Sequence, residues 1–171
     1  MNDNVESILT LIVLLALLMA AFVPVIAFIV FVFFLSSRRK QTVNRILTTQ
    51  SQLVADRRWY PVRYASEPRF KSWIKFFPWE GAGILVMAPG SVLFFGEVST
   101  RPVTLQFAPA NSTVNWLGKA PWPNGAVSWF HFTMPEQKHY FSSETGVFVF
   151  GSHNGTKEIY EAAARSFAGQ V

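Results

Sequence analysis

The side chains that most often perform acid–base or metal chemistry are few in this sequence. Its 171 residues include three histidines, His131, His139 and His153, and no cysteine. The lack of cysteine excludes thiolate nucleophiles and cysteine-ligated metals. His131 and His139 fall in a predicted hairpin whose alternation places them on opposite faces, so they do not converge on one metal ion. We therefore expect no metal and no cofactor.

The acidic residues do not form a catalytic arrangement either. Aspartate occurs only at Asp3 and Asp56, outside the predicted domain at 81–171. A Ser-His-Asp triad therefore cannot be assigned in that domain, and no feature marks a nucleophile. The glutamates of its strand region are scattered near predicted turns, at Glu97, Glu136 and Glu144. We expect no catalytic residue and no enzymatic activity. The remaining alternative is an enzyme that uses His131 or His139.

The longest feature of the chain is an uncharged apolar stretch, residues 8–35, which contains one proline, Pro24. As a helix this stretch extends about 42 Å, and a bilayer core about 30 Å thick needs about 20 helical residues. One crossing therefore fits and two do not. A cleaved signal peptide has a shorter apolar region and a basic start, whereas residues 1–7 are acidic. We predict a retained transmembrane helix over 8–35.

The distribution of charge predicts the orientation of this helix. Residues 1–7 carry two acids and no Lys or Arg. Four basic residues follow the apolar stretch closely: Arg38, Arg39, Lys40 and Arg45. Because positively charged flanks favour the cytoplasmic side, we expect a single-pass membrane protein. Its short N-terminus, residues 1–7, would lie outside and its C-terminal domain in the cytoplasm.

Basic and aromatic residues interleave in the predicted connector between helix and domain, residues 36–80. The connector holds ten Lys or Arg and three acidic residues, whereas residues 81–171 hold five of each sign. Aromatic rings favour the headgroup level, and each nearby Lys or Arg adds about 1 kcal/mol on an anionic surface. We expect anionic lipid headgroups to contact Arg38, Arg39, Lys40, Arg57, Arg58, Trp59, Arg63, Arg69, Lys71, Trp73 and Lys75. Nucleic acid is not an expected partner, because the domain itself is neutral.

The connector also permits a structural interpretation. Its apolar residues between 40 and 58 recur at helical spacing, which predicts a helix that ends before Pro61; these are Val43, Ile46, Leu47, Leu53 and Val54. The aromatic residues that follow can pack under the domain, as its first strand or as a helix covering an open end. Both interpretations stay open, because rings can face inward while basic side chains face outward.

Beyond residue 80 the apolar period changes from helix to strand. Residues 84–87 and 92–95 predict a hairpin that reverses at Pro89-Gly90. Alternation predicts further strands at 103–107, 112–117 and 147–150. The domain at 81–171 is therefore expected to be mainly β.

A second hairpin is predicted around residues 135–138, with Met134 opposite His139. Alternation then places three aromatic rings on one buried face: Phe130, Phe132 and Phe141. After a predicted loop at 151–155, an amphipathic helix begins with Thr156 as its cap and ends at Gly169. Its apolar stripe comprises Ile159, Tyr160, Ala163 and Phe167.

Three stretches within residues 80–168 carry about seven short strands and a closing helix: GILVMAPGSVLFF, SWFHFTMPEQKHYFSSE and GTKEIYEAAARSF. This order resembles the pleckstrin-homology (PH) superfold, in particular its GRAM-like and bacterial PH-like branches. The resemblance implies a seven-stranded barrel or sandwich of two sheets with a C-terminal α-helix. It also implies a non-catalytic module that binds lipids, peptides or proteins.

The resemblance bears on phosphoinositide binding as well. Members of the superfold that bind phosphoinositides hold the phosphates with a basic cluster in the first hairpin loop. The loop predicted here is Ala88–Ser91, which contains no Lys or Arg. Headgroup binding at that loop is therefore not expected.

The loop at 118–125 places Trp122 between two prolines with Lys119 nearby. It can enter the headgroup layer or receive a partner; alternatively, Trp122 packs back on the barrel. Together these features predict a membrane-anchored, non-catalytic interaction or scaffold protein, an accessory subunit with membrane-protein partners. The alternative is a module that senses anionic lipids.

Overall fold

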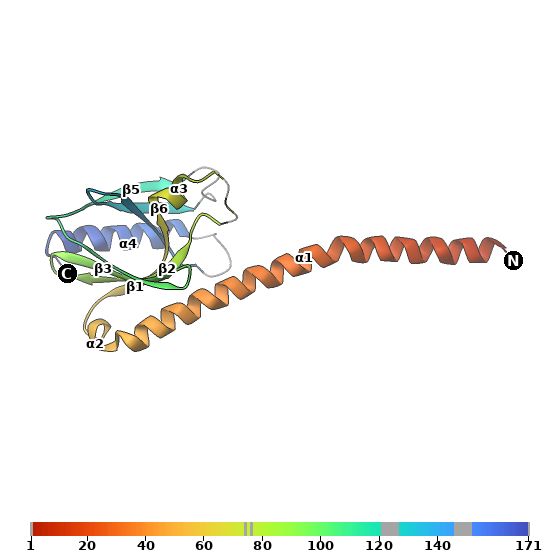
Figure 1. Ribbon diagram of the computed structural model, residues 1–171, viewed down its shortest axis with the longest axis horizontal. Coiled ribbons are helices and arrows are strands. Elements are labelled where there is room, and N and C mark those ends of the chain that lie inside the picture. Colours follow the sequence, from red (N-terminus) through yellow and green to blue (C-terminus); the bar gives the residue numbers. More distant parts are fainter. Residues whose placement is uncertain (1, 74, 76, 121–126, 146–151, 171) are drawn as a thin grey trace. The chain divides into compact units, whose positions relative to one another are not determined.

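The computed structural model describes residues 2–73, 75, 77–120, 127–145 and 152–170 (Figure 1). The chain forms two compact units, Met1–Ser37 and Arg38–Val171. The first unit is the greater part of helix α1 (Asn2–Thr49). The second contains the end of α1 and the sheet, together with three further helices: α2 (Ser51–Val54), α3 (Glu67–Lys71) and α4 (Ser152–Phe167).

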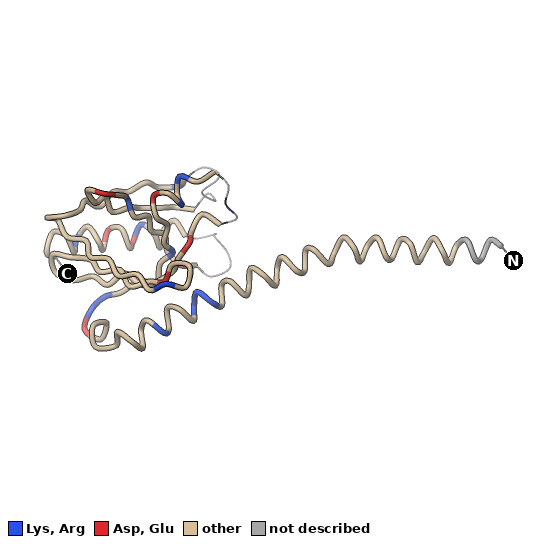
Figure 2. Tube along the Cα trace, viewed as in Figure 1, with Lys and Arg blue, Asp and Glu red and all other residues tan. Residues whose placement is uncertain are grey.

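Helix α1 is long and apolar enough to cross a membrane, judged by length and composition alone. Between Ile8 and Phe34 its large apolar side chains are exposed, apart from the partly exposed Val32. Figure 2 shows no charged residue along this part of the helix. A helix that is apolar on every face is favoured in hydrocarbon and costly in water. Pro24 lies inside the helix without ending it.

Seven strands of the described chain form one antiparallel sheet in the order β4-β3-β2-β1-β7-β6-β5. The strands are β1 (Trp59–Ser66), β2 (Gly81–Ala88), β3 (Ser91–Val98), β4 (Arg101–Phe107), β5 (Thr113–Lys119), β6 (Ser128–Thr133) and β7 (Lys138–Ser143). The sheet is not closed, and β4 and β5 are its edges. The predicted class, a helix followed by a mainly-β domain, is confirmed. The resemblance implied two sheets, whereas hydrogen bonding is continuous from β4 to β5.

The central strand, β1, comes from the segment that we predicted as a connector. It pairs with β2 through residues 59–64 and with β7 through residues 62–66. Of the two interpretations left open, packing as a first strand is therefore correct for this part of the connector. The strand predicted at 147–150 lies outside the described residues. One of the seven strands of the sheet is thus β1, which lies before residue 81, the predicted start of the domain.

The β2–β3 hairpin forms as predicted. Ala88 pairs with Ser91, so that Pro89 and Gly90 make a two-residue turn. Gly90 has a φ of +72°, a conformation that costs side chains other than glycine roughly 1–2 kcal/mol.

The register of the β6–β7 hairpin differs from the prediction. Thr133 pairs with Lys138 and Phe132 with His139, whereas we had placed Met134 opposite His139. The turn is shorter than predicted. The Met134 N–H donates to Gln137 O, which leaves Pro135 and Glu136 between the two, whereas the predicted pairing left residues 135–138. A shift of two residues keeps every side chain on its face. Phe130, Phe132 and Phe141 therefore share the core, as predicted.

Helix α4 fills the concave side of the sheet (Figure 1). Its Ile159, Ala162 and Ala163 pack into the main core. That core draws on most strands through Val62, Tyr64, Leu85, Met87, Val92, Phe94, Phe107, Phe130, Phe132 and Phe141. The helix begins at Ser152, earlier than predicted, so residues 152–155 are helical rather than a loop.

Thr156 does not cap α4, contrary to the prediction. It is fully buried inside the helix, and its hydroxyl accepts a hydrogen bond from the Ser143 N–H at 3.0 Å. The side chain therefore fastens α4 to the end of β7. Gly169 follows the end of the helix, as predicted, with a φ of +73°.

Substitution of Gly83 in β2 tests this packing, because there is no space for a side chain at that position. A Cβ atom at Gly83 would lie 2.2 Å from Phe95 O. We expect Gly83→Ala to lower the free energy of unfolding by about 2 kcal/mol or more, since backbone would have to move. Urea unfolding of the full chain in detergent, followed by near-UV circular dichroism, measures this loss. Gly90→Ala is the control: nothing lies within 4 Å of its Cβ, and it should cost only about 1 kcal/mol. Equal losses would contradict the packing.

Candidate functional site

The segment after the apolar stretch packs on the sheet face opposite α4. We call residues 38–54, the end of α1 together with α2, the covering segment. Its Val43 and Val54 are buried against Ile84 and Val86 of β2. Around these four lie the partly buried Ile46, Leu47, Leu53, Leu93 and Phe95. Alternation along β2 puts Leu85 and Met87 in the α4 core instead. The predicted helical stripe is therefore confirmed, and the sheet is covered on both faces.

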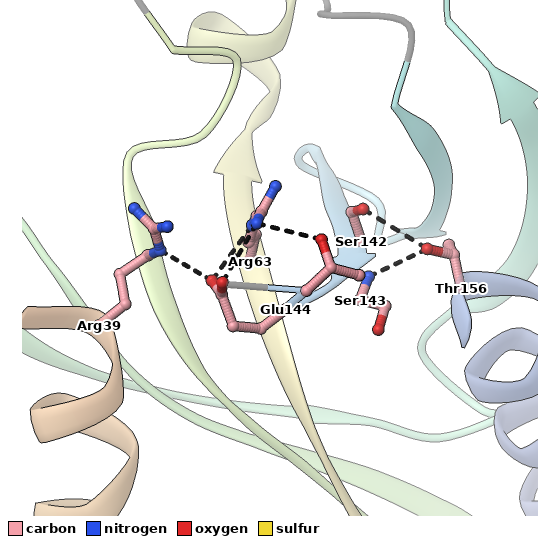
Figure 3. Close-up of polar contacts among 7 residues, drawn as sticks. Arg39, Arg63, Ser142, Ser143, Glu144 and Thr156 are labelled. Carbon is pink, nitrogen blue, oxygen red and sulfur yellow. Dashed lines mark hydrogen bonds and ion pairs between the residues drawn. The ribbon is translucent and has the colours of Figure 1, made fainter. Parts of the chain in front are cut away.

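A buried ion-pair network joins the beginning of the covering segment to the central strand (Figure 3). Arg63 of β1 is fully buried. Its Nε and Nη2 donate to the two carboxylate oxygens of Glu144, each at 3.1 Å. Arg39 of the covering segment donates from Nε to Glu144 Oε2 at 2.8 Å. One carboxylate thus holds two guanidinium groups from segments far apart in the sequence, one of them in the bidentate geometry that strengthens such pairs.

The ring of Trp79 completes this network. The Arg63 Cζ lies 4.2 Å from the ring centroid and the Arg39 Cζ lies 5.4 Å from it. Two cations near one carboxylate leave an excess positive charge, and an indole face stabilises such charge. We call Arg39, Arg63, Trp79 and Glu144 the arginine cluster. No local pattern indicated this cluster, because Glu144 is 81 residues from Arg63 and 105 from Arg39.

This placement changes the set of predicted headgroup contacts. Arg63 has no accessible surface and therefore cannot meet a headgroup in this fold. The Arg39 side chain is only 12% exposed and its Nε binds Glu144. Arg38 and Lys40, on either side of Arg39, are exposed.

The residues at the start of β1 lie elsewhere and have other partners. Arg58 pairs with Glu158 of α4 at 3.0 Å, with more than half of each side chain exposed. Its Cζ lies 5.3 Å from the ring centroid of Tyr60. Arg57 is exposed, and Trp59 is 36% exposed. The structure therefore distributes the predicted contacts over separate places and does not gather them in one site.

The connection between β1 and β2 holds the remaining predicted contacts. Lys71 pairs with Glu67 at 2.6 Å, and the other oxygen of Glu67 accepts the Lys138 N–H at 2.9 Å. A hydrogen bond from the Lys71 ammonium lowers the pKa of the partly exposed Glu67 carboxyl. Arg69 Nη2 donates to Phe77 O at 3.0 Å. Trp73 stands out, because 73% of its surface is exposed.

Lys75 is held more firmly than an ordinary surface lysine. Its Nζ donates to Phe70 O at 2.7 Å and to Arg69 O at 3.1 Å. Burial, and secondarily the charge of Arg69, lowers the pKa of Lys75. The ring of Phe70 stacks on Tyr140 with centroids 3.9 Å apart. The aromatic residues of the connector thus divide: Phe70 packs inside the domain and Trp73 faces solvent.

The first loop of the sheet is therefore not the one we predicted. Because β1 precedes β2, the first hairpin connection is residues 67–80 and not Ala88–Ser91. It contains Arg69, Lys71 and Lys75 together with Glu67 and Glu80, so it holds one more basic than acidic residue. The error arose because β1 contains Pro61 and the buried Arg63, which hid its alternating pattern in the sequence.

The other predicted partner contacts are described only in part. Lys119 is exposed at the end of β5. Trp122 lies outside the described residues.

The histidines do not converge. His139 is buried in the main core, where the Tyr64 hydroxyl lies 2.9 Å from its Nδ1. Desolvation lowers the pKa of both His139 and His131, and it raises the pKa of Tyr64 to about 12. His131 and His139 are on opposite faces, as predicted. His153 Nδ1 lies 2.9 Å from Ser128 Oγ. Among the described residues no three His, Asp or Glu side chains could share a metal ion.

A groove of about 340 Å³ lies between the covering segment and the β3–β4 hairpin. Its apolar lining comprises Ile46, Phe95, Pro102 and Val103, and its polar lining includes Thr49, Gln50 and Thr104. At one side Arg45 pairs with Glu97, which also accepts from Thr42 Oγ1 at 3.2 Å. No sequence signal pointed to this groove, because helix and hairpin are separated by more than forty residues.

The arginine cluster predicts a large penalty when its carboxylate is removed. Glu144→Gln removes the carboxylate charge that Arg39 and Arg63 share, and breaking a buried pair costs about 3–5 kcal/mol. Urea unfolding of the full chain in detergent measures the loss. Glu158→Gln is the matched control, because the Arg58–Glu158 pair is exposed and such pairs contribute about 1 kcal/mol or less. A loss below about 1 kcal/mol for Glu144→Gln would mean that the cluster does not hold the fold.

Comparison of the chain with protein-family models, with curated proteins and with solved structures found no match. The resemblance to the PH superfold therefore rests on strand order and on the position of α4.

Proposed function

We propose that this chain is a single-pass membrane protein that presents a non-catalytic, PH-like interaction domain, as an accessory or scaffold subunit of a larger membrane complex. The observation that carries this proposal is the continuity of helix α1. Its apolar part exposes hydrophobic side chains on every face, and its end packs into the sheet domain. An anchor that leads directly into a folded domain suits a protein whose role is to hold a surface next to the bilayer.

The orientation is part of the proposal. The basic residues that follow the apolar stretch favour a cytoplasmic domain whether or not they also form ion pairs, because the rule depends on their number near the membrane. Arg39 and Arg45 are paired with glutamates, and Arg38 and Lys40 are exposed. The N-terminus then lies outside the cytoplasm.

Two features support a PH-like identity for the domain. The described residues form seven antiparallel strands in which each consecutive pair from β1 to β4, and from β5 to β7, is adjacent. Helix α4 then closes one side of the sheet. The open sheet is the departure from the barrel that the resemblance implies. The proposed role as a binding module is an inference from this likeness in strand order, because a fold alone does not determine function.

A partner should remain with the protein when it is extracted from membranes. We expect the affinity-tagged full chain, purified in mild detergent, to retain at least one membrane protein at a constant molar ratio. Native mass spectrometry or light scattering would measure that ratio. The matched control carries Glu144→Gln, which loosens the domain but keeps the anchor and should lower the recovery of the partner. A monomer without any stoichiometric partner would contradict the proposal.

A second candidate function, recognition of anionic lipid, is favoured by the connection between β1 and β2. This first loop presents Lys71 and Trp73 to solvent. In PH-like proteins that bind phosphoinositides, the first loop is the basic one. Trp at headgroup level and Lys beside it are the side chains that such a contact uses.

The lipid function predicts binding that depends on charge. Residues 38–171 should sediment with vesicles containing phosphatidylserine, and not with phosphatidylcholine alone, and should dissociate in high salt. Lys71→Glu should weaken this binding about fivefold or more, since each lysine near the surface contributes about 1 kcal/mol. Lys157→Glu on α4 makes the same charge change and should have little effect. Sedimentation that ignores lipid charge would exclude this function.

A further inference from the structure

The outer edge of β4 carries backbone groups that point away from the sheet. Val98 and Arg101 pair across the two-residue turn at Ser99-Thr100. Residues that flank such a turn exchange both backbone hydrogen bonds with each other, and the pattern then alternates along the strand. Arg101, Val103 and Leu105 therefore bond to β3. The backbone groups of Pro102, Thr104 and Gln106 face outward.

These outward groups are centred on Thr104. Pro102 offers only a carbonyl, because proline has no N–H. The Gln106 carbonyl accepts from the Asn111 side-chain amide at 3.4 Å, whereas its N–H faces the edge. Thr104 offers both a donor and an acceptor. A proline at one end of an edge strand limits pairing there, so the stretch available for an added strand is 104–106 with the Pro102 carbonyl.

The groove lies beside this same stretch. Pro102 pairs with Glu97 and Thr104 with Phe95, so these side chains share the face on which the covering segment packs. The groove is lined by all four of them and by Ile46 and Thr49 of the covering segment. A strand added at β4 would point alternate side chains to that face. One of them, if large and apolar, would reach the groove.

From this geometry we propose that β4 accepts an extended segment of a partner protein as an added strand, with one large apolar side chain in the groove. The inference rests on the proposed function, since it names the surface that meets the partner. Backbone pairing supplies affinity and the groove supplies selectivity, as in other cases of strand addition.

An extended segment suits this surface better than a helix or a second copy. A helix satisfies its own backbone and would leave the Thr104 groups unpaired. If two copies paired through their β4 strands with the two Thr104 residues opposite each other, the side chains that one copy turned toward the other's groove would be Pro102, Thr104 and Gln106. None of these is a large apolar side chain, so the groove would stay unfilled.

Charge adds a requirement on the partner segment. The Arg45 side chain is 65% exposed although it pairs with Glu97, and Arg101 is exposed at the end of β4. An acidic residue beside the apolar one would meet these cations. The expected ligand is therefore an alternating stretch with a large apolar residue followed or preceded by Asp or Glu.

The test uses the full chain in nanodiscs and a phage library of random peptides, with counter-selection on the Thr104→Pro variant. Proline is tolerated at an outward edge position, so the β3–β4 ladder should persist in that variant. We expect enriched peptides to combine alternation, a large apolar residue and an acid. Thr104→Pro should weaken the binding of a selected peptide about tenfold, because an outward hydrogen bond is lost. Thr104→Val, which keeps the N–H, should change it little.

If Thr104→Pro misfolds, its loss of binding says nothing about the edge, so a second variant and a second measurement are needed. Thr49→Trp fills the groove from the exposed side of the helix and should also weaken binding about tenfold. Amide exchange at Thr104 and Gln106 should slow when the peptide binds. The proposal is overturned if no peptide is enriched, if selected peptides bind both variants normally, or if Thr104→Pro instead abolishes a dimer. Should a partner still co-purify with Thr104→Pro, the proposed function stands and this edge is not its interface.

Discussion

A charged side chain in the middle of a sheet must be neutralised where it lies, because water cannot reach it and an isolated buried ion is very costly. Arg63 of β1 is in that position. Its counter-charge, Glu144, follows the end of β7 and also binds Arg39. The Glu144 N–H donates to Pro61 O, which fixes the backbone from which this carboxylate extends. The carboxylate that compensates Arg63 also binds Arg39, and this shared ion pair ties the beginning of the covering segment to the sheet.

Apolar packing continues the contact between the covering segment and the sheet beyond Arg39. An open sheet has two faces, and each must be covered if its apolar side chains are to leave water. Helix α4 covers one face through Ile159, Ala162 and Ala163. The covering segment protects the other through Val43 and Val54. The chain that leaves the apolar stretch is therefore part of the domain, and it also forms one wall of the groove beside β4.

Hydrophobic periodicity and turn residues were sufficient to predict the features that depend only on neighbouring residues in the sequence. The apolar stretch, the helical stripe from Val43 to Val54, the Pro89-Gly90 turn and the buried face of the β6–β7 hairpin all follow from periodicity or turn chemistry. The register of that hairpin did not follow, because a shift of two residues leaves the same side chains buried. A pattern of burial alone cannot distinguish the two registers.

Long-range pairing determined what the sequence could not show. The strand β1 was hidden because its alternation is interrupted by Pro61 and by the buried Arg63, a residue type that usually lies on the surface. In the sequence, Glu144, the partner of Arg63, was one of several glutamates near predicted turns. The same limit applies to the groove, whose walls meet only after the sheet has folded. Residues chosen for their type alone, such as Arg63, were therefore assigned to lipid although they hold the domain together.

The covering segment belongs to the folded domain. Hydrogen exchange of the full chain in nanodiscs, comparing amides of residues 43–54 with those of β2, measures whether it does. We expect both groups to open with a similar free energy and Glu144→Gln to lower both free energies together, since they form one cooperative unit. Rapid exchange of residues 43–54 while β2 remains protected would show instead that the segment is only a tether.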